Sequence, residues 1–387
     1  MKLKELLYMK VIMYFIMFSI MLSFCYHGLS IFKYINIFLF IIIIFKYIIT
    51  RNKSKFSIAL LIYIIMLFIS TKLSQYPNVL GTFNVYCSII TLSLYVDMGL
   101  KFYGREITKV LYRTLYVLIF INFLTILLYP NGMYATIYYS TNWFLGYDNT
   151  HICIFLPALM LMLINQNITK KKSFMDILLI CFITYSVFYC FSANSVVVYT
   201  IILIYIIFHN KLNKINALNV KNYIILYLAM FFGLVIFRIQ EIFSWFIVNV
   251  LNKTITFTGR TSIWDRVILL IKKKPILGYG KEKIEVVISK LGHKSYSHAH
   301  NTILDILYKG GFISLLIMSY IIYICAKELK KYQHNKISKI VGITLFCFFI
   351  MSLFEAREEK IGLYIILIYA YNISYLVENK EFDQHEG

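Results

Sequence analysis

The stretch SHAHNTILDILYKGGFISLLIMSYIIYIC, residues 297–325, decides the fold class of this protein. Residues 303–325 are mostly apolar, and a membrane-spanning helix needs roughly 20 such residues. Two histidines, His298 and His300, stand directly before this apolar run. The stretch therefore predicts a membrane helix with a polar, titratable group at its entrance.

The rest of the chain has the composition expected around such a helix. The sequence is 60% hydrophobic and 15% charged, with a mean hydropathy of +0.73, whereas soluble domains contain about 25% charged residues. We therefore expect an all-α polytopic membrane protein with about 12 transmembrane helices. The predicted spans are centred near 7–25, 31–49, 57–71, 82–99, 110–129, 152–166, 176–192, 195–209, 222–239, 303–325, 340–355 and 361–376.

The net charge of +21 bears on orientation. In a soluble protein such an excess would suggest a nucleic-acid partner, but in a polytopic membrane protein it indicates basic loops on the cytoplasmic side. Lysine and arginine gather in alternate short loops, for example at residues 170–172 and 327–339. We therefore predict cytoplasmic N and C termini and no nucleic-acid partner.

The predicted spans divide the chain into three parts. Residues 1–240 hold spans 1 to 9, and residues 303–387 hold spans 10 to 12 and a cytoplasmic tail. Residues 241–302 between them form a large outer loop, the only long polar segment of the sequence. Because this loop ends at the two histidines, we expect it to carry the chemistry.

A short amphipathic helix is predicted within the outer loop. Ser262 and Asp265 fit a capping box, and an apolar stripe runs from Trp264 to Ile271 before Pro275 ends the helix. This pattern favours a helix lying on the membrane surface with Trp264 at headgroup depth. A helix packed on the surface of the protein is the alternative.

Polar residues within this loop and at its end suggest a site. Arg260, at the start of the predicted helix, can bind a phosphate with the free backbone N–H groups there, or can simply face solvent or lipid headgroups. His298 and His300 can accept a proton near neutral pH. The H-x-H spacing can also bind a metal; no nearby cysteine or acid clearly completes a tetrahedral set, with His293 and Asp305 as the conceivable further ligands. Asn301 either caps the next helix or contacts a sugar.

Several residues predict close packing around the histidines. Asp305 and Lys309 are spaced to pair on one face of the helix, which compensates two charges at lipid depth. Gly278 and Gly280 permit a sharp turn or a close backbone approach. The glycines at 310 and 311 permit close helix packing.

Two motifs together resemble the O-antigen polymerase and ligase family, which includes the Wzy-type polymerases of O-antigen, capsule and exopolysaccharide. They are GRTSIWDRVILLIKKKPILGYG (259–280) and SHAHNTILDILYKGG (297–311). The resemblance implies a membrane-embedded glycosyltransferase of the bacterial plasma membrane that uses neither a metal nor a cofactor. It implies an oligosaccharide on polyprenyl (undecaprenyl) pyrophosphate as donor, with a chain-length regulator and a flippase of the same pathway as protein partners.

The resemblance also implies roles for individual residues. His300 matches the family's essential histidine, which deprotonates or orients the acceptor hydroxyl, and Arg260 matches the loop arginine that steadies the leaving pyrophosphate. Many members carry another arginine at an outer turn that reads FSANSVVVY (191–199) here, with Asn194 in its place, so Arg238 is a candidate replacement; a simple polar turn is the favoured interpretation of Asn194. The segment WFLGYDNTH (143–151) resembles a family loop that precedes the sixth span. Either Asn149 and Asp148 contact sugar with Trp143 as a stacking platform, or Trp143 is an interfacial aromatic anchor. The candidate substrate-binding residues are His298, Asn301, Arg266, Arg238, Asn194, Asn149 and Tyr279.

Three functions fit the sequence to different degrees. A polymerase that joins polyprenyl-linked repeat units at the outer face of the membrane is the preferred hypothesis. A ligase that transfers a finished glycan to a lipid or protein acceptor uses the same chemistry. A flippase or transporter of lipid-linked glycan is the third, but it would place functional charges near the bilayer midplane and gives no reason for the long outer loop.

Overall fold

The computed structural model describes residues 3–25, 30–51, 53–136, 141–242, 245, 259–292 and 297–378. This part of the chain is helical apart from turns, connecting loops and one hairpin of two short strands, as expected for an all-α protein. Its elements are α1 (Leu3–Cys25), α2 (Ser30–Ile49), α3 (Lys55–Lys72), α4 (Val79–Leu128), β1 (Asn142–Trp143), β2 (Gly146–Tyr147), α5 (Asp148–Thr169), α6 (Phe174–Cys190), α7 (Ala193–Leu212), α8 (Val220–Met230), the π-helix η1 (Phe231–Ile236), the 3-10 helix η2 (Ile239–Glu241), α10 (Arg260–Lys273), α11 (Ile284–Leu291), α12 (Thr302–Lys331), α13 (Lys336–Ser352), α14 (Ile361–Tyr371) and α15 (Ile373–Val377).

Each predicted span overlaps a helix, but the eleventh, 340–355, runs past the end of α13 at Ser352, so Glu355 lies outside the helix. Within the described residues, six helices are long and apolar enough to cross a membrane: α2, α3, α4, α5, α7 and α12. The sequence expectation differs at the fourth and fifth spans, which form one helix of 50 residues with a break at Tyr103. The expected inner loop there is helical, and its cations pair with acids on neighbouring turns, as Lys109 does with Glu106 at 3.0 Å.

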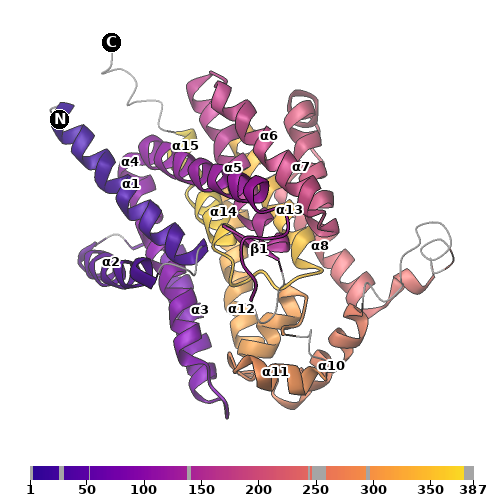
Figure 1. The fold of residues 1–387 in the computed structure, drawn as a ribbon. Coiled ribbons are helices and arrows are strands. Elements are labelled where there is room, and N and C mark those ends of the chain that lie inside the picture. The colour runs from indigo at the N-terminus through magenta and orange to yellow at the C-terminus, as the bar shows by residue number, and fades with distance from the viewer. Residues whose placement is uncertain are drawn as a thin grey trace.

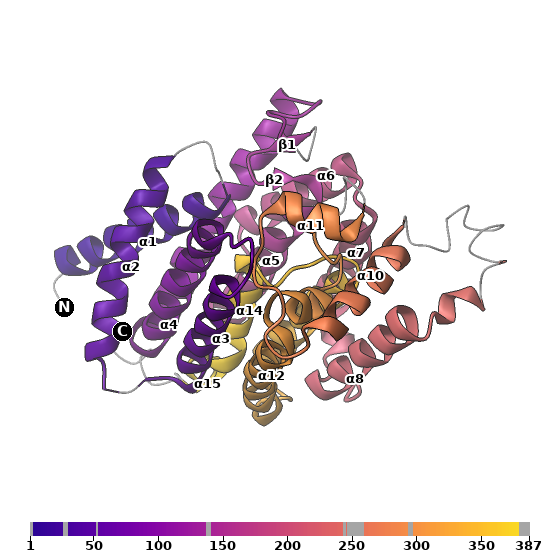
Figure 2. The same ribbon diagram turned by 90° about the horizontal axis from the view of Figure 1, so that it is seen from below.

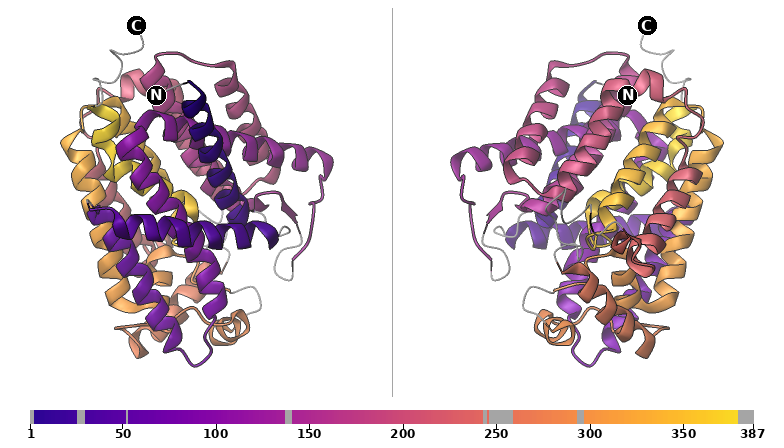
Figure 3. Two further views of the ribbon diagram at one scale, coloured as in Figure 1. Left: turned by 90° about the vertical axis from the view of Figure 1, so that its left-hand side faces the viewer. Right: turned by 90° about the vertical axis from the view of Figure 1, so that its right-hand side faces the viewer.

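The helices place α10 and α11, which belong to the predicted outer loop, at the opposite end of the bundle from the start of α1 and the end of α15. Figures 1 and 3 show that α1 begins and α15 ends at the same end of the bundle, whereas α10 and α11 lie at the other end. Viewed from that end, α3 and α12 run side by side, with α10 and α11 next to them (Figure 2). Cytoplasmic termini and an outer loop remain predictions that are compatible with this arrangement.

The glycines of the two sequence motifs lock the loop after α10 against α12. Tyr279 donates its backbone N–H to the carbonyl of Tyr308 at 2.7 Å, and Phe312 donates to the carbonyl of Pro275 at 2.8 Å. Gly311 breaks α12 with φ 62° and ψ −166°, a conformation open essentially to glycine alone. A Cβ on Gly311 would overlap the carbonyl of Ile276, and a Cβ on Gly278 would meet the carbonyl of Tyr308. The close backbone approach predicted at Gly278 is therefore confirmed.

Two expectations about α10 were wrong. Its N-cap is Gly259 without a side-chain cap, and Ser262 instead donates its hydroxyl to the Gly259 carbonyl at 2.8 Å, so there is no capping box. Trp264 is fully buried and therefore packs inside the protein, whereas the membrane-surface interpretation placed it among lipid headgroups. The predicted end of the helix before Pro275 is confirmed, because α10 ends at Lys273.

Candidate active site

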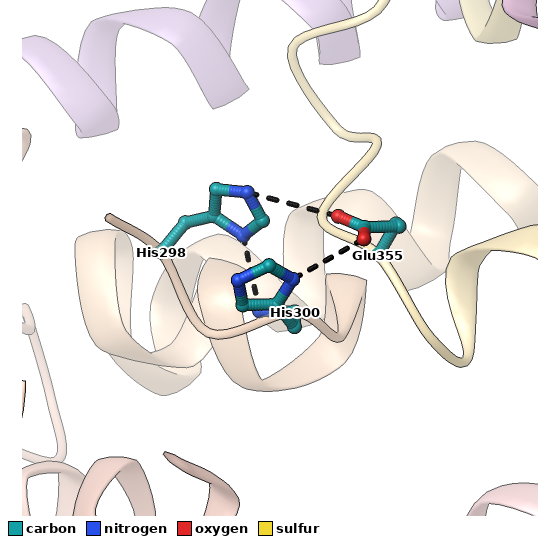
Figure 4. A group of neighbouring side chains, drawn as sticks. All are labelled: His298, His300 and Glu355. Atoms are coloured by element: carbon teal, nitrogen blue, oxygen red, sulfur yellow. Dashed lines mark hydrogen bonds and ion pairs between the residues drawn. The ribbon is translucent and has the colours of Figure 1, made fainter. Parts of the chain in front are cut away.

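Two loops that are distant in sequence meet at the histidines. His298 and His300 lie in the segment that enters α12, and Glu355 lies between α13 and α14 (Figure 4). His300 Nδ1 is 3.2 Å from Glu355 Oε1, and His298 Nε2 is 3.7 Å from Glu355 Oε2. Arg260, the first residue of α10, places a guanidinium nitrogen 2.9 Å from the same carboxylate. Both predicted catalytic residues therefore converge on Glu355.

The hydrogen bonds assign a proton arrangement to this cluster. The backbone N–H of His300 donates to His298 Nδ1 at 3.1 Å, so the His298 proton resides on Nε2, which faces Glu355. Burial, and next the neighbouring His300, lower the pKa of His298 from 6.5 to about 4, so that this ring is neutral at neutral pH.

Glu355 is ionised in this setting. Burial opposes the charge, but the hydrogen bond from His300 and the nearby His298 and Arg357 hold the pKa of Glu355 well below its usual value. An ionised carboxylate only accepts hydrogen bonds, so His300 donates from Nδ1. In the neutral form of the ring, Nε2 then carries the lone pair that can take up a proton, as in other carboxylate–histidine pairs.

Backbone geometry fixes the positions of the rings. His300 adopts φ 48°, a left-handed conformation that is uncommon for a residue with a side chain and is frequent at functional sites. Asn301 caps α12 by accepting from the backbone N–H of Leu304 at 3.0 Å, and its amide donates to the Leu353 carbonyl at 3.0 Å. Thr302 donates its hydroxyl to the carbonyl of Glu355 at 3.0 Å. These contacts fasten the two loops together.

The cluster also has the composition of a metal site. One ligand atom each from His298, His300 and Glu355 lie within 4.8 Å of one another, and Glu355 supplies the acid that the sequence did not reveal. His293 lies outside the described residues. Arg260 already pairs with Glu355, and Arg357 adds a second positive charge close to it. Because these cations oppose a third positive charge, the geometry favours proton transfer over metal binding.

A cavity of about 930 Å³ opens at this cluster. Its wall includes His298, His300, Arg260 and Asn149. A second wall is an ion-pair network centred on Lys309, whose ammonium lies 2.6 Å from Asp305, as the sequence spacing predicted, 2.6 Å from Glu358 and 2.9 Å from Glu359. Lys281 lies 2.6 Å from Glu359 and extends the network. The cavity therefore has both charge signs on its surface.

Five predicted substrate-binding residues lie outside the cavity wall, and their substrate role stays a prediction. Asn301 caps α12, as one of the two sequence interpretations held. Arg266 donates to the Leu291 carbonyl at 2.7 Å, Arg238 pairs with Asp265 at 2.6 Å, Asn194 donates to the Met351 carbonyl at 3.0 Å, and Tyr279 stacks on Tyr308 with ring centroids 5.2 Å apart.

The α13–α14 loop contributes site residues that the sequence analysis did not assign. Residues 355–360 read EAREEK, and all six line the cavity. The signal was present in the sequence, because five charged residues within six positions interrupt a strongly apolar region. Without knowledge of the contact between this loop and the His300 segment, however, these charged residues indicate only a short polar turn between two spans.

Comparison with known proteins agrees with this site. Residues 177–319 match the family model described as O-antigen ligase. The matched region includes Arg260, His298 and His300 and ends before Glu355. No curated protein matches the chain. The match, with the apolar helices, supports a multi-pass membrane enzyme of polymerase- or ligase-type glycan transfer. The chain therefore carries an O-antigen ligase family domain over residues 177–319, in agreement with the resemblance to the O-antigen polymerase and ligase family.

Proposed function

We propose that this protein is a polysaccharide polymerase that joins oligosaccharide repeat units carried on polyprenyl pyrophosphate. The reaction takes place at the outer face of the bacterial plasma membrane. The observation that carries the proposal is the convergence of His300 and Arg260 on Glu355, in the wall of a cavity large enough for several sugar rings. Residues of α10 and α11 contribute to the cavity wall, and these helices lie at the end of the bundle opposite the start of α1 (Figure 1).

In the proposed reaction, His300 acts as the general base. Its Nε2 takes the proton from a hydroxyl of the acceptor glycan, and that oxygen forms a bond to the sugar carbon attached to pyrophosphate. The bond between this carbon and the pyrophosphate oxygen breaks, and its electron pair leaves with the polyprenyl pyrophosphate. Arg260 stabilises the negative charge that develops on the leaving oxygen.

Glu355 is a positioning residue in this scheme. It holds His300 Nδ1 and Arg260 within 3.2 Å and 2.9 Å of one carboxyl oxygen, so it fixes the tautomer of the base and its distance from the cation. A base that is already oriented loses less entropy when it reaches the transition state.

Ligase-type transfer to a lipid or protein acceptor is the second candidate, and the family match favours it equally. The two are separated by giving purified protein in lipid nanodiscs a polyprenyl-pyrophosphate-linked oligosaccharide as the only substrate. A polymerase produces a ladder of chain lengths. A product that forms only after a different acceptor is added, and in which each acceptor receives a single glycan, supports the ligase. Movement of the lipid-linked glycan across a vesicle membrane without new glycosidic bonds supports a transporter and contradicts both.

A further inference from the structure

The cations that line the cavity differ in how they are neutralised. Arg260, Lys281 and Lys309 each lie within 3.0 Å of a carboxylate. Lys360 also lines the cavity, yet among the residues that the structure describes its ammonium makes no ion pair or hydrogen bond. Lys360 therefore has no direct ion-pair partner among the described residues of the cavity wall, although Glu358 and Glu359 lie close enough to favour its charged form.

Arg357 stands three residues before Lys360 and adds to this charge. Its side chain is 3% exposed, and one guanidinium nitrogen donates to the Asn149 carbonyl at 2.7 Å. Its Nε has no hydrogen-bond partner in the described part of the chain, although a buried donor without a partner is costly. The buried guanidinium of Arg357 therefore leaves one donor unused, and its charge acts on the neighbouring Lys360.

The two cations are held on one short, well-anchored turn. The backbone N–H of Lys360 donates to the Arg357 carbonyl at 3.0 Å, and the backbone N–H of Arg357 donates to the Thr302 hydroxyl at 2.9 Å. Thr302 is the first residue of α12, immediately after His300 and Asn301. The turn is therefore fixed to the same segment that positions the proposed base.

From these contacts we infer that Arg357 and Lys360 form an anion-binding subsite, which takes the pyrophosphate of the lipid-linked donor. This inference rests on the proposed function for the identity of the anion. It supplies the second cation that Asn194, at the α6–α7 turn, does not provide. Burial, together with Arg357, lowers the pKa of Lys360, and a bound anion would reverse that effect.

A binding experiment on the full chain in nanodiscs tests the subsite with inorganic pyrophosphate as the probe. Lys360→Gln removes the free ammonium. We expect the Kd for pyrophosphate, measured by calorimetry, to rise about 10-fold or more, which is the effect of losing one charged hydrogen-bond donor. Lys360→Arg should retain binding. Lys283→Gln is the matched control, because Lys283 is exposed at the start of α11 and outside the cavity wall. Equal affinity of wild type and Lys360→Gln would overturn the inference.

The source of the anion is tested in parallel, because an acidic sugar of the glycan would present a carboxylate to the same cations. Binding of glucuronate without binding of pyrophosphate by the wild type would contradict the assignment. If Lys360→Gln does not accumulate, amine-reactive labelling of the wild type replaces it. Pyrophosphate should then protect Lys360 and leave Lys283 labelled, whereas equal labelling of Lys360 with and without pyrophosphate contradicts the subsite.

The same preparations separate this inference from the proposed function. Pyrophosphate binding that depends on Lys360, in a protein that forms no glycosidic bond, would leave the subsite standing and reject the glycosyltransferase. Glycan transfer by the wild type, together with equal pyrophosphate affinity of the wild type and Lys360→Gln, would reject the subsite and leave the glycosyltransferase standing.

Discussion

Glu355→Gln is the substitution that tests the proposed arrangement of base and cation. Glutamine has nearly the same shape but no charge, and only one of its two terminal atoms accepts hydrogen bonds. In the wild type one carboxyl oxygen lies 2.9 Å from Arg260 and 3.2 Å from His300 Nδ1. Each hydrogen bond to a charged group contributes about 1.5–3 kcal/mol, and one of the two can survive in the variant.

The expected loss of stability is therefore about 2–3 kcal/mol. The expected loss of rate is larger, because a positioned general base contributes roughly 100- to 10,000-fold and Glu355 sets its tautomer. We expect kcat for glycan transfer to fall about 100-fold or more, with a smaller change in KM and an altered pH profile of the rate.

The assay is time-resolved transfer from a lipid-linked oligosaccharide, with thermal unfolding measured on the same samples. Glu285→Gln is the matched control, because Glu285 is exposed on α11 and the same chemical change there should leave kcat and its pH profile unaltered. Transfer by Glu355→Gln at the wild-type rate, with the wild-type pH profile, would refute the positioning role.

Three further predictions concern backbone, protonation and orientation. Gly311→Ala should lower stability by several kcal/mol, since its φ of 62° with ψ of −166° excludes a side chain, whereas Gly342→Ala, whose Cβ would meet its nearest neighbour at 3.7 Å, should be nearly neutral in a thermal unfolding comparison. The pKa of His298 is about 4 in the folded protein and about 6.5 in the unfolded chain, so the unfolded chain binds more protons between these two pH values. Stability should therefore fall as the pH drops from about 6.5 to 4, by up to about 1.4 kcal/mol per pH unit. A His298→Gln variant whose stability shows the same pH slope would contradict this. In intact cells, a membrane-impermeant maleimide should label Glu285→Cys on α11 and not Lys336→Cys at the α12–α13 turn, and the opposite pattern would invert the proposed topology.

Periodicity and length predicted the helices well, because a membrane-spanning helix requires a long run of apolar residues that is visible in the sequence. The α4 helix shows the limit of this reasoning. A cluster of basic residues between two apolar runs predicts a loop, yet Lys109 and Glu106 pair on successive turns and the backbone continues as helix through all but Tyr103.

Tertiary placement explains the other differences. Trp264 belongs to the apolar stripe of an amphipathic helix, and the same stripe can pack against lipid or against protein. Only the packing of α10 against α12 shows that Trp264 is buried. Similarly, nothing in EAREEK (355–360) indicates that Glu355 meets His300, because the contact joins residues 55 positions apart in sequence. His300 and Arg260 were predictable from the family resemblance, whereas their shared partner was not.

The most direct test of the central claim is glycosidic bond formation by the purified wild type and by His300→Gln, each in nanodiscs with a polyprenyl-pyrophosphate-linked oligosaccharide. Our account predicts a ladder of joined repeat units from the wild type and a rate about 100-fold or more lower from the variant at equal protein amount and equal thermal stability. A wild type that forms no bond, or a His300→Gln variant that polymerises at the wild-type rate, would contradict it.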